Sequence, residues 1–248
     1  MTADDRQARS FGQAADAYDA IRPSYPREAI EWALGTEPLE VVDLGAGTGI
    51  LSRLLAAVGH RVTAVDPDHK MLAALRAKSA GVADARPGDA EHIPLPDASA
   101  DAVTAGQAYH WFDPGHAHPE IARVLRPGGV FVPIWNIRDS SVPWVAEMSE
   151  YIGTSKAERT VRQLEGSHFP PYFEPTERFE TRYTRPFDED ALVELVKSRS
   201  YYLTGDDAHR AELERRARDL VHTHPDLAGR DTFELPYVTV AYRLRHNG

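Results

Sequence analysis

Leu39-Glu-Val-Val-Asp-Leu-Gly-Ala-Gly-Thr-Gly-Ile-Leu51 joins an apolar, β-rich run to three alternating glycines and then to a helix-like pattern. Val41 and Val42 suit a buried strand, because β-branched residues favour extended backbone. The glycines allow a tight turn and a close approach of the backbone to a ligand. A helix expected over 49–58 would point its free N–H groups at the same place. The stretch therefore predicts a strand, a turn and a helix that form a binding site.

The spacing of the glycines distinguishes two kinds of nucleotide site. A dinucleotide fingerprint, G-x-G-x-x-G, would need a glycine at position 50, where this chain has Ile50. The observed pattern is D-x-G-x-G-x-G, with an acid two residues before the first glycine. This pattern resembles the first motif of class I S-adenosylmethionine (SAM)-dependent methyltransferases. The resemblance implies that the cofactor is bound by Asp43, Gly45, Ala46, Gly47 and Gly49.

The composition suits one α/β domain. The chain has 248 residues, which is enough for a large core with a small cap. Its net charge of −10 disfavours non-specific binding to nucleic acid or to an anionic membrane, so neither is expected as a partner. The absence of cysteine excludes disulfides, thiolate nucleophiles and cysteine-ligated zinc. A polar amino terminus, and no apolar run near the roughly 20 residues of a membrane span, favour a cytoplasmic enzyme.

The residues before the first strand, 1–37, form an aromatic leader that includes Arg22-Pro-Ser-Tyr-Pro26, with a helix expected over 27–34. The leader could simply dock on the domain, or it could close over the cofactor. The second interpretation comes from a resemblance to the F-x(6)-Y-x(3)-R-P-x-Y-P segment of small-molecule methyltransferases near trans-aconitate methyltransferase. That resemblance implies that Tyr18 and Arg22 lie at the methionine end of SAM and that Tyr25 faces the substrate.

An acid ends the second expected strand, 61–65. Asp66 lies about 20 residues past the first glycine, where a carboxylate holds the ribose diol in βαβ nucleotide sites. Asp66 followed by Pro67 is also a common helix start, and the two roles are compatible. In the helix expected over 68–79, Met71 is predicted to be core that also reaches the adenine.

A second acid follows the third expected strand, 82–86. In the resembling family, an acid at this place reaches the adenine amino group while the next backbone amide meets a ring nitrogen. The matching residues here are Asp89 and Ala90. An aspartate after glycine is also an ordinary turn residue, which is the alternative for Asp89.

The fourth expected strand, 101–106, is followed by Gln107-Ala-Tyr-His-Trp-Phe-Asp113. Ligands of open α/β sheets bind beyond the carboxyl ends of the strands, so this segment should face the cofactor. Its sequence pattern, Q-A-x-H-W-F-D, resembles that of the trans-aconitate methyltransferase-like branch. We therefore assign Gln107 and Ala108 to the cofactor. The substrate pocket is assigned Tyr25, Tyr109, His110, Trp111 and Trp135.

His110 is the candidate general base in this segment, with an ordinary histidine pKa near 6.5. The alternative is that His110 and Trp111 are packing residues. His110, His116 and His118 with Asp113 could also mimic a two-histidine, one-carboxylate metal set. The pair His116 and His118 lies in a segment expected to be an ordinary helix, so no metal is predicted.

The rest of the chain alternates helices, loops and strands. After the fourth strand we expect a helix over 115–124, a turn over 125–129, a strand over 130–135, helices over 144–152 and 156–164, a loop over 166–175, a strand over 179–187, a helix over 188–198, a loop over 200–205, a helix over 206–221 and a final strand over 233–244. The fold predicted is a Rossmann-like, doubly wound α/β domain: seven strands, mostly parallel, an antiparallel last strand and a small helical cap.

As a single methyltransferase domain, the chain would comprise an amino-terminal lid (1–37), a SAM-binding core (38–136), a cap or substrate insert (137–175) and the carboxyl-terminal part of the sheet (176–248). It would transfer the methyl group of SAM to an oxygen, nitrogen or carbon of a small molecule, leaving S-adenosylhomocysteine. Carboxylate acceptors are suggested by the resemblance alone. The alternatives are an NAD(P)-dependent oxidoreductase, against which Ile50 argues, and a protein that binds SAM without catalysis.

Overall fold

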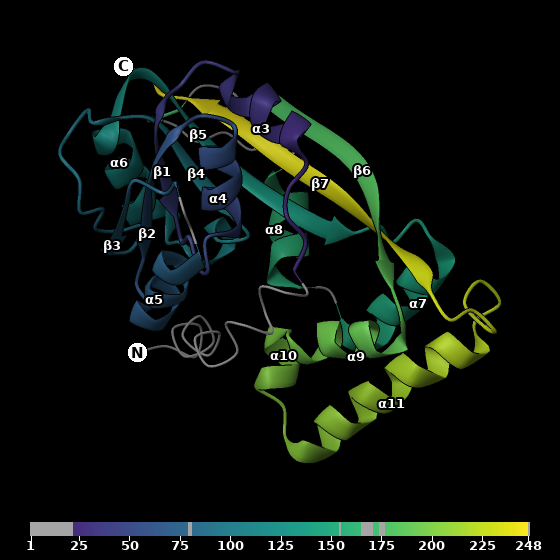
Figure 1. Cartoon of the computed structure of the whole chain (residues 1–248). Coiled ribbons are helices and arrows are strands. Elements are labelled where there is room, and N and C mark those ends of the chain that lie inside the picture. The colour runs from purple at the N-terminus through teal and green to yellow at the C-terminus, as the bar shows by residue number, and fades with distance from the viewer. Residues whose placement is uncertain (1–21, 79–80, 154, 165–170, 174–176, 248) are drawn as a thin grey trace.

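The computed structural model describes residues 22–78, 81–153, 155–164, 171–173 and 177–247. In these residues the chain forms a seven-stranded sheet with helices on both of its faces (Figure 1). The cofactor contact predicted for Tyr18 lies outside the described residues, as does most of the loop expected over 166–175.

The sheet has the spatial order β3-β2-β1-β4-β5-β7-β6. The strands are β1 Glu40–Leu44, β2 Arg61–Asp66, β3 Asp84–Pro87, β4 Ala100–Gly106, β5 Leu125–Arg138, β6 Glu177–Phe187 and β7 Phe233–Arg245. Strands β1 to β5 pair in parallel, whereas β7 is antiparallel to both β5 and β6. The predicted doubly wound sheet with an antiparallel last strand is therefore confirmed. Its order reverses between β1 and β4, and ligands of such sheets bind at that switch point.

The last of the described helices is the longest, and the others are short. They are α3 Arg27–Leu34, α4 Ile50–Ala57, α5 His69–Lys78, α6 Pro114–Val124, α7 Pro143–Ile152, α8 Lys156–Leu164, α9 Glu189–Lys197, α10 Ser200–Leu203 and α11 Asp207–Thr223, with a 3-10 turn, η2, at Tyr109–Trp111. Asp113, Asp188 and Asp206 cap α6, α9 and α11, because each side chain accepts a backbone N–H of the first turn. Within the described ranges, no helix combines the length and apolar character needed to cross a membrane.

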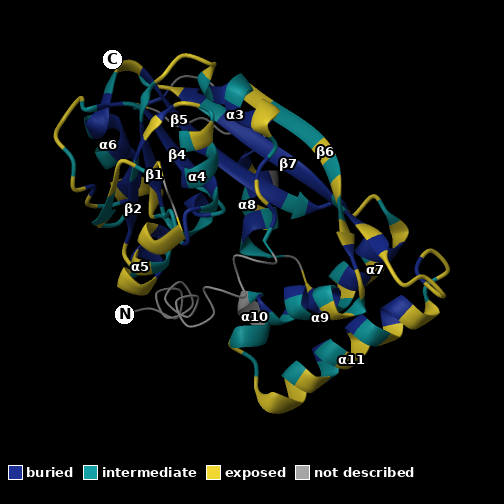
Figure 2. Cartoon of the chain, in the orientation of Figure 1, coloured by how far each residue is buried: buried dark blue, intermediate teal, exposed yellow. Residues whose placement is uncertain are grey.

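The parallel part of the sheet is buried on both faces. Val41 packs with α3 and α4 on one face, while its neighbour Val42 packs with α6 and α8 on the other. This alternation follows from the twofold side-chain period of a strand. Figure 2 shows the buried residues concentrated along the strands, with the exposed ones on the outer helix surfaces. The helices packed on the two faces thus fix the positions of the strand ends that form the site.

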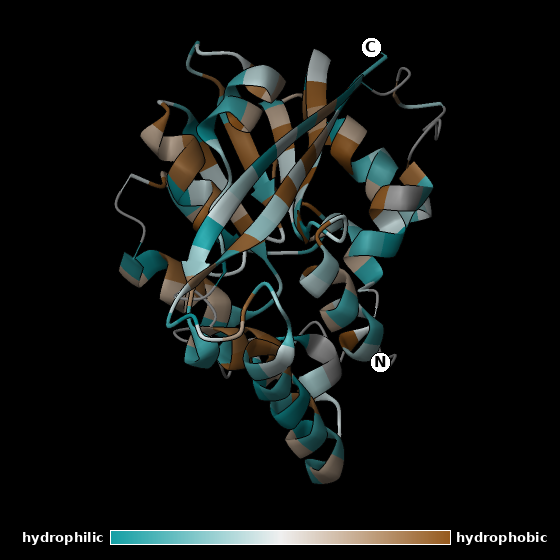
Figure 3. Cartoon of the chain, turned by 90° about the vertical axis from the view of Figure 1, so that its right-hand side faces the viewer, coloured by the Kyte–Doolittle hydropathy of each residue, from teal (hydrophilic) through white to brown (hydrophobic). Residues whose placement is uncertain are grey.

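A separate apolar core lies where β6 and β7 extend past the rest of the sheet. Here α7, α9 and α11 pack against the strand ends, and α10 contacts α9 and α11. We call these four helices the helical cluster. The apolar residues of α11 recur at helical spacing on its inner side, and the helix is largely hydrophilic elsewhere (Figure 3). The cluster combines α7, from the predicted cap, with α9 and α11, which match the helices expected over 188–198 and 206–221.

Two local predictions differ from the structure. Strand β5 begins at Leu125 rather than at 130, because the expected turn is an irregularity within the strand: Ala100 pairs with Leu125 and Ala102 with Val130. The expected loop over 200–205 contains α10, a single turn closed on the Arg199 carbonyl. One helical turn is too short to give a periodic signal in the sequence.

Candidate functional site

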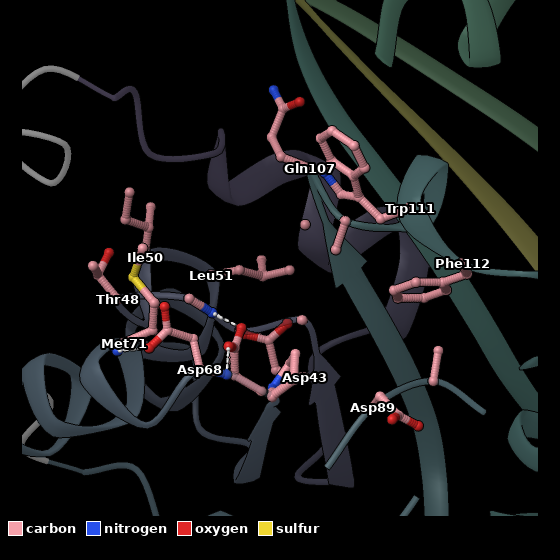
Figure 4. Close-up of a pocket in the computed structure, with 18 of the residues that line it drawn as sticks. Asp43, Thr48, Ile50, Leu51, Asp68, Met71, Asp89, Gln107, Trp111 and Phe112 are labelled. Atoms are coloured by element: carbon pink, nitrogen blue, oxygen red, sulfur yellow. Dashed lines mark hydrogen bonds between the residues drawn. The ribbon is translucent and has the colours of Figure 1, made fainter. Parts of the chain in front are cut away.

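A cavity of about 290 Å³ opens at the carboxyl ends of β1, β2 and β4, at the predicted switch point. Its wall includes most of the residues predicted to bind a cofactor: Arg22, Asp43, Gly45, Ala46, Gly47, Asp66, Pro67, Met71, Asp89, Ala90, Gln107 and Ala108. In Figure 4, Gln107 and Trp111 lie on one side, Met71 and Asp68 on another, and Asp89 below Phe112. Five segments far apart in the sequence therefore meet around one cavity.

The glycine turn forms the floor of this cavity. Gly45, Gly47 and Gly49 have φ angles of 70°, 56° and 83°, in the left-handed region that favours glycine. A Cβ atom on Gly45 would lie 2.6 Å from the Cβ of Ala108, so a side chain there would push β4 away from β1. Gly49 is the residue before α4 and, unlike Gly45 and Gly47, is not part of the cavity wall.

Asp66 is held rigidly at the end of β2 and is only 7% exposed. Its Oδ2 accepts the Gly47 N–H and its Oδ1 accepts the Asp68 N–H, both at 2.8 Å. Burial raises the pKa of Asp66, and these two backbone donors oppose that shift. Each carboxylate oxygen can accept a further hydrogen bond, so the group can receive both hydroxyls of a ribose diol.

Asp43 braces the turn from below and is 1% exposed. Its two oxygens accept hydrogen bonds from Ser52 of α4, at 2.5 Å, and from Thr104 of β4, at 3.1 Å. Burial raises the pKa of Asp43 to about 6, although the two hydroxyl donors oppose the shift. The side chain therefore ties three elements together beneath the cavity as well as contributing to its wall.

The loop after β3 forms another side of the cavity. Asp89 accepts the Glu91 N–H at 3.2 Å, while Glu91 accepts the Asp113 N–H at 2.9 Å. Ala90 is buried between them. This arrangement fixes the loop to the segment after β4, and it leaves Asp89 half-buried at the wall.

The end of β4 is both crowded and strained. Gln107 has φ 55°, a left-handed conformation that is unusual for a residue with a side chain, and its Nε2 donates to the Asn136 carbonyl at 2.5 Å. A Cβ on Gly106 would lie 2.8 Å from the Tyr25 hydroxyl. Asn136 in turn donates to the Ser24 carbonyl at 3.2 Å. These contacts hold Tyr25 and the end of the leader against the cavity.

The residues predicted to face the substrate separate into two groups. Tyr25 and Trp111 are part of the cavity wall. Tyr109 and Trp135 are instead buried in the core of the same face, where the Tyr109 hydroxyl lies 2.9 Å from His118 Nε2. Because η2 is a tight 3-10 turn, it directs Tyr109 inward and Trp111 toward the cavity, which the sequence alone did not reveal.

His110 lies behind the wall rather than in it. Its Nδ1 accepts the Trp135 indole N–H at 3.2 Å. Since an indole can only donate, the proton of the neutral imidazole is on Nε2. Burial lowers the pKa of His110 to about 3, and the charges of Lys156 and Arg22 lower it further, so the expected pKa near 6.5 does not apply. This geometry makes His110 a hydrogen-bond donor and occupies the lone pair that a general base needs.

The remaining histidines of the motif do not converge. His116 pairs with Asp113 at the exposed start of α6, whereas His118 packs against Tyr109 in the core. In the described part of the chain, no three histidine, aspartate or glutamate side chains gather as a metal set. Wall residues that the motifs did not indicate are Pro23, Thr48, Ile50, Leu51, Asp68, Glu91, Gly106 and Phe112. Most of them adjoin a motif residue in the chain, which is the signal that could have identified them.

Comparisons with known proteins match the segment that surrounds the cavity. A family model described as a methyltransferase domain matches residues 42–132. An uncharacterized methyltransferase from Mycobacterium tuberculosis is 45% identical over 234 residues, which cover 94% of each chain. A malonyl-[acyl-carrier protein] O-methyltransferase from Pectobacterium atrosepticum is 35% identical over 61% of each chain. A solved structure of a candidate type II methyltransferase from Anaeromyxobacter dehalogenans has a TM-score of 0.56 and 27% identity, covering 91% of this chain and 97% of that one.

Proposed function

The chain belongs to the class I SAM-dependent methyltransferases, and from that membership we propose that it methylates a small molecule bound beside Trp111 and Tyr25. The observation that carries the proposal is the shared cavity. The glycine turn, Asp66, Asp89 and Gln107 each lie at or just after the carboxyl end of a different strand, and all four border one cavity. This is the place where an open α/β sheet holds a nucleotide-like cofactor.

The residues around the cavity fit SAM. A Cβ atom on Gly47 would meet no protein atom within 4 Å, so the turn leaves room there for close approach of a ligand, and Asp66 offers two carboxylate oxygens to the ribose. Asp89 and Ala90 are part of the wall, and we expect the Asp89 carboxylate and the Ala90 amide to contact the adenine. Arg22, which is also part of the wall, would offer its guanidinium to the methionine carboxylate. Bound SAM supplies a methyl group that is electrophilic because it is attached to a sulfonium.

The protein's own contribution is chiefly orientation and exclusion of water. An electrophilic methyl group needs an acceptor aligned at near-attack distance, and no catalytic triad is required. The strained backbone at Gln107 and the contact of Tyr25 with Gly106 fix the wall on the side of β4. His110 steadies that wall by its hydrogen bond with Trp135 and takes up no proton near neutral pH. An acceptor that is already ionised, or that loses its proton to water, suits such a site.

A small-molecule acceptor is supported by the size of the cavity and by one relative. The cavity of about 290 Å³ is enclosed by several segments of the chain, as is typical of a site for a small ligand. The relative from Pectobacterium atrosepticum is named for methylating an oxygen of a malonyl group on a carrier protein. We infer an oxygen acceptor on a small molecule for this chain.

The test is release of S-adenosylhomocysteine from SAM in the presence of a low-molecular-weight metabolite pool. Full-length protein is expected to release it with the pool and not without it, and mass spectrometry should find a product heavier by one methyl group. NADH serves as the control ligand for the oxidoreductase alternative. Binding of SAM without turnover on any fraction would support the non-catalytic alternative instead.

A further inference from the structure

Strand β6 is a long, open edge of the sheet. It has 11 residues and lies at the end of the strand order, beside β7 (Figure 1). In the described part of the chain, its backbone is hydrogen-bonded on this one side, to β7. Alternate residues of an edge strand direct their N–H and C=O groups outward, where they can pair with a further strand. The outer side of β6 is therefore a place where a strand can be added to the sheet.

The side chains of β6 restrict which strand can be added. Its sequence, Glu177-Arg-Phe-Glu-Thr-Arg-Tyr-Thr-Arg-Pro-Phe187, distributes acids and arginines along the whole strand. The side chains of Glu177, Arg178 and Arg182 are 53%, 38% and 64% exposed. Charged side chains at an edge usually prevent pairing with a foreign strand. A partner strand must therefore carry a charge pattern that matches this one.

A second copy of β6 has the matching pattern. When two copies of the strand run antiparallel about a twofold axis at Thr181, Glu180 of each copy lies opposite Arg182 of the other. In the same register, Glu177 lies opposite Arg185. The symmetry repeats both pairs, so each occurs twice. Opposite charges that face each other across two strands stabilise the pairing.

The aromatic residues of β6 match in this register as well. Phe179 lies opposite Tyr183 of the other copy, and cross-strand aromatic pairs are among the stabilising ones. Within its own chain, Phe179 stacks on Trp32 of α3, with the ring centroids 5.3 Å apart. Tyr183 stacks on Tyr237 of β7, at 5.6 Å. Because both rings are already held in place, pairing requires little further ordering of these side chains.

The neighbouring registers bring like charges together. In a regular antiparallel pair of identical strands, the axis passes through a residue, because two kinds of residue pair alternate along the ladder. With the axis at Glu180, that residue would face its own copy, and Arg178 would face Arg182. With the axis at Arg182, that arginine would face its own copy. Like charges directly opposite each other are destabilising, so the pattern selects the axis at Thr181. This axis also leaves Pro186, which has no N–H donor, outside the paired stretch.

We propose that two copies of this chain associate through β6, antiparallel and about a twofold axis at Thr181, so that one sheet runs through both. The proposal is independent of the proposed function, because no residue of β6 is part of the cavity wall. A pair of edge strands buries less than the roughly 800 Å² per partner of a standard stable interface. The net charge of −10 on each copy also opposes association. The dimer should therefore form reversibly and at high protein concentration.

Sedimentation velocity of the full-length protein tests the proposal, over concentrations from about 1 to about 300 μM. The wild type should change from monomer to dimer across this range. Glu180→Arg and Arg182→Glu each place like charges opposite each other on both sides of the axis, so each should associate at least about tenfold more weakly. Mixed in equal amounts, the two variants should form a heterodimer, because the arginine introduced in one faces the glutamate introduced in the other. A purely structural effect of either substitution would give no such rescue.

Arg61→Glu is the matched control. Arg61 is an arginine of β2 that is 73% exposed and lies 3.7 Å from Glu40 of its own chain, as Arg182 lies 2.8 Å from Glu180. This variant should dimerise as the wild type does. Arg182 also contacts Asp139, at 3.3 Å, so melting temperatures are measured for every variant; if Arg182→Glu does not fold, Glu180→Arg tests the register alone.

Three results would overturn the proposal. The first is a wild type that stays monomeric up to the highest concentration. The second is association of Glu180→Arg and Arg182→Glu as tight as that of Arg61→Glu, which would assign any dimer to another surface. The third is the absence of a heterodimer in the mixture of two folded variants. Affinity for S-adenosylhomocysteine should be the same in all of these proteins, and its loss would not bear on the dimer.

Discussion

Substitution of Gly45 by alanine should damage this protein far more than the same change at another glycine with positive φ. The Cβ of an alanine at position 45 would lie 2.6 Å from the Cβ of Ala108, an impossible contact between two short side chains at the meeting of β1 and β4. Gly229, in the turn between α11 and β7, has a similar φ of 77°, but a Cβ atom added there would meet open space. The pair therefore separates steric contact from backbone conformation.

The magnitude follows from two contributions. A left-handed conformation costs an alanine about 1 kcal/mol, and this contribution is common to both positions. At position 45 the clash adds overpacking, which in a filled core typically costs about 1–3 kcal/mol. Gly45→Ala should thus lower the free energy of unfolding by about 2–4 kcal/mol, and Gly229→Ala by about 1 kcal/mol.

Urea unfolding measures both variants, with S-adenosylhomocysteine affinity as the second readout. Gly45→Ala should also lose cofactor affinity, because relief of the clash moves the turn that forms the cavity floor. Gly229→Ala should bind as the wild type does. Equal losses of stability at the two positions, or full affinity in Gly45→Ala, would refute the account of the turn.

Three further predictions concern buried groups. Burial raises the pKa of Asp43 from 3.8 to about 6, so the folded state holds a proton that the unfolded state has released, and stability should fall as the pH rises through that window. Across that pH window, the free energy of unfolding of the wild type should drop by about 3 kcal/mol relative to that of Asp43→Asn. Parallel pH profiles for the two proteins would contradict this. His110 should keep its Nε2–H tautomer, without titrating, from pH 5 to 9 in nitrogen NMR spectra; a midpoint near 6.5 would be the contrary result. Tyr109→Phe should lower stability by roughly 1 kcal/mol and leave S-adenosylhomocysteine affinity within about twofold of the wild type. A larger loss of affinity would indicate that Tyr109 lines the cavity.

The cofactor side of the site was predictable because its signals are local and ordered. A glycine turn after one strand and an acid after the next are fixed by chain order, and the sheet topology brings successive carboxyl ends to one edge. Asp66 and Asp89 therefore lie at the same cavity as Gly45. Helix starts such as Asp188 and Asp206 were readable for the same reason, since a cap acts within one turn.

The acceptor side was not predictable in this way. Whether Tyr109 or Trp111 faces the cavity depends on the conformation of a three-residue turn, and the buried position of Trp135 depends on what packs across β5. The contact of His110 with the Trp135 indole, which argues against a role as general base, has no sequence signature.

The central claim is that this cavity binds SAM through Asp66. Calorimetric titration of S-adenosylhomocysteine into wild type, Asp66→Asn and Asp84→Asn tests it most directly; Asp84 is an exposed acid of β3 and matches the change in charge. The wild type and Asp84→Asn should bind one equivalent with the same affinity, and Asp66→Asn should bind about 10- to 100-fold more weakly, the loss expected when a charged acceptor of two ribose hydroxyls becomes neutral. Equal affinity in Asp66→Asn and the wild type would contradict the account.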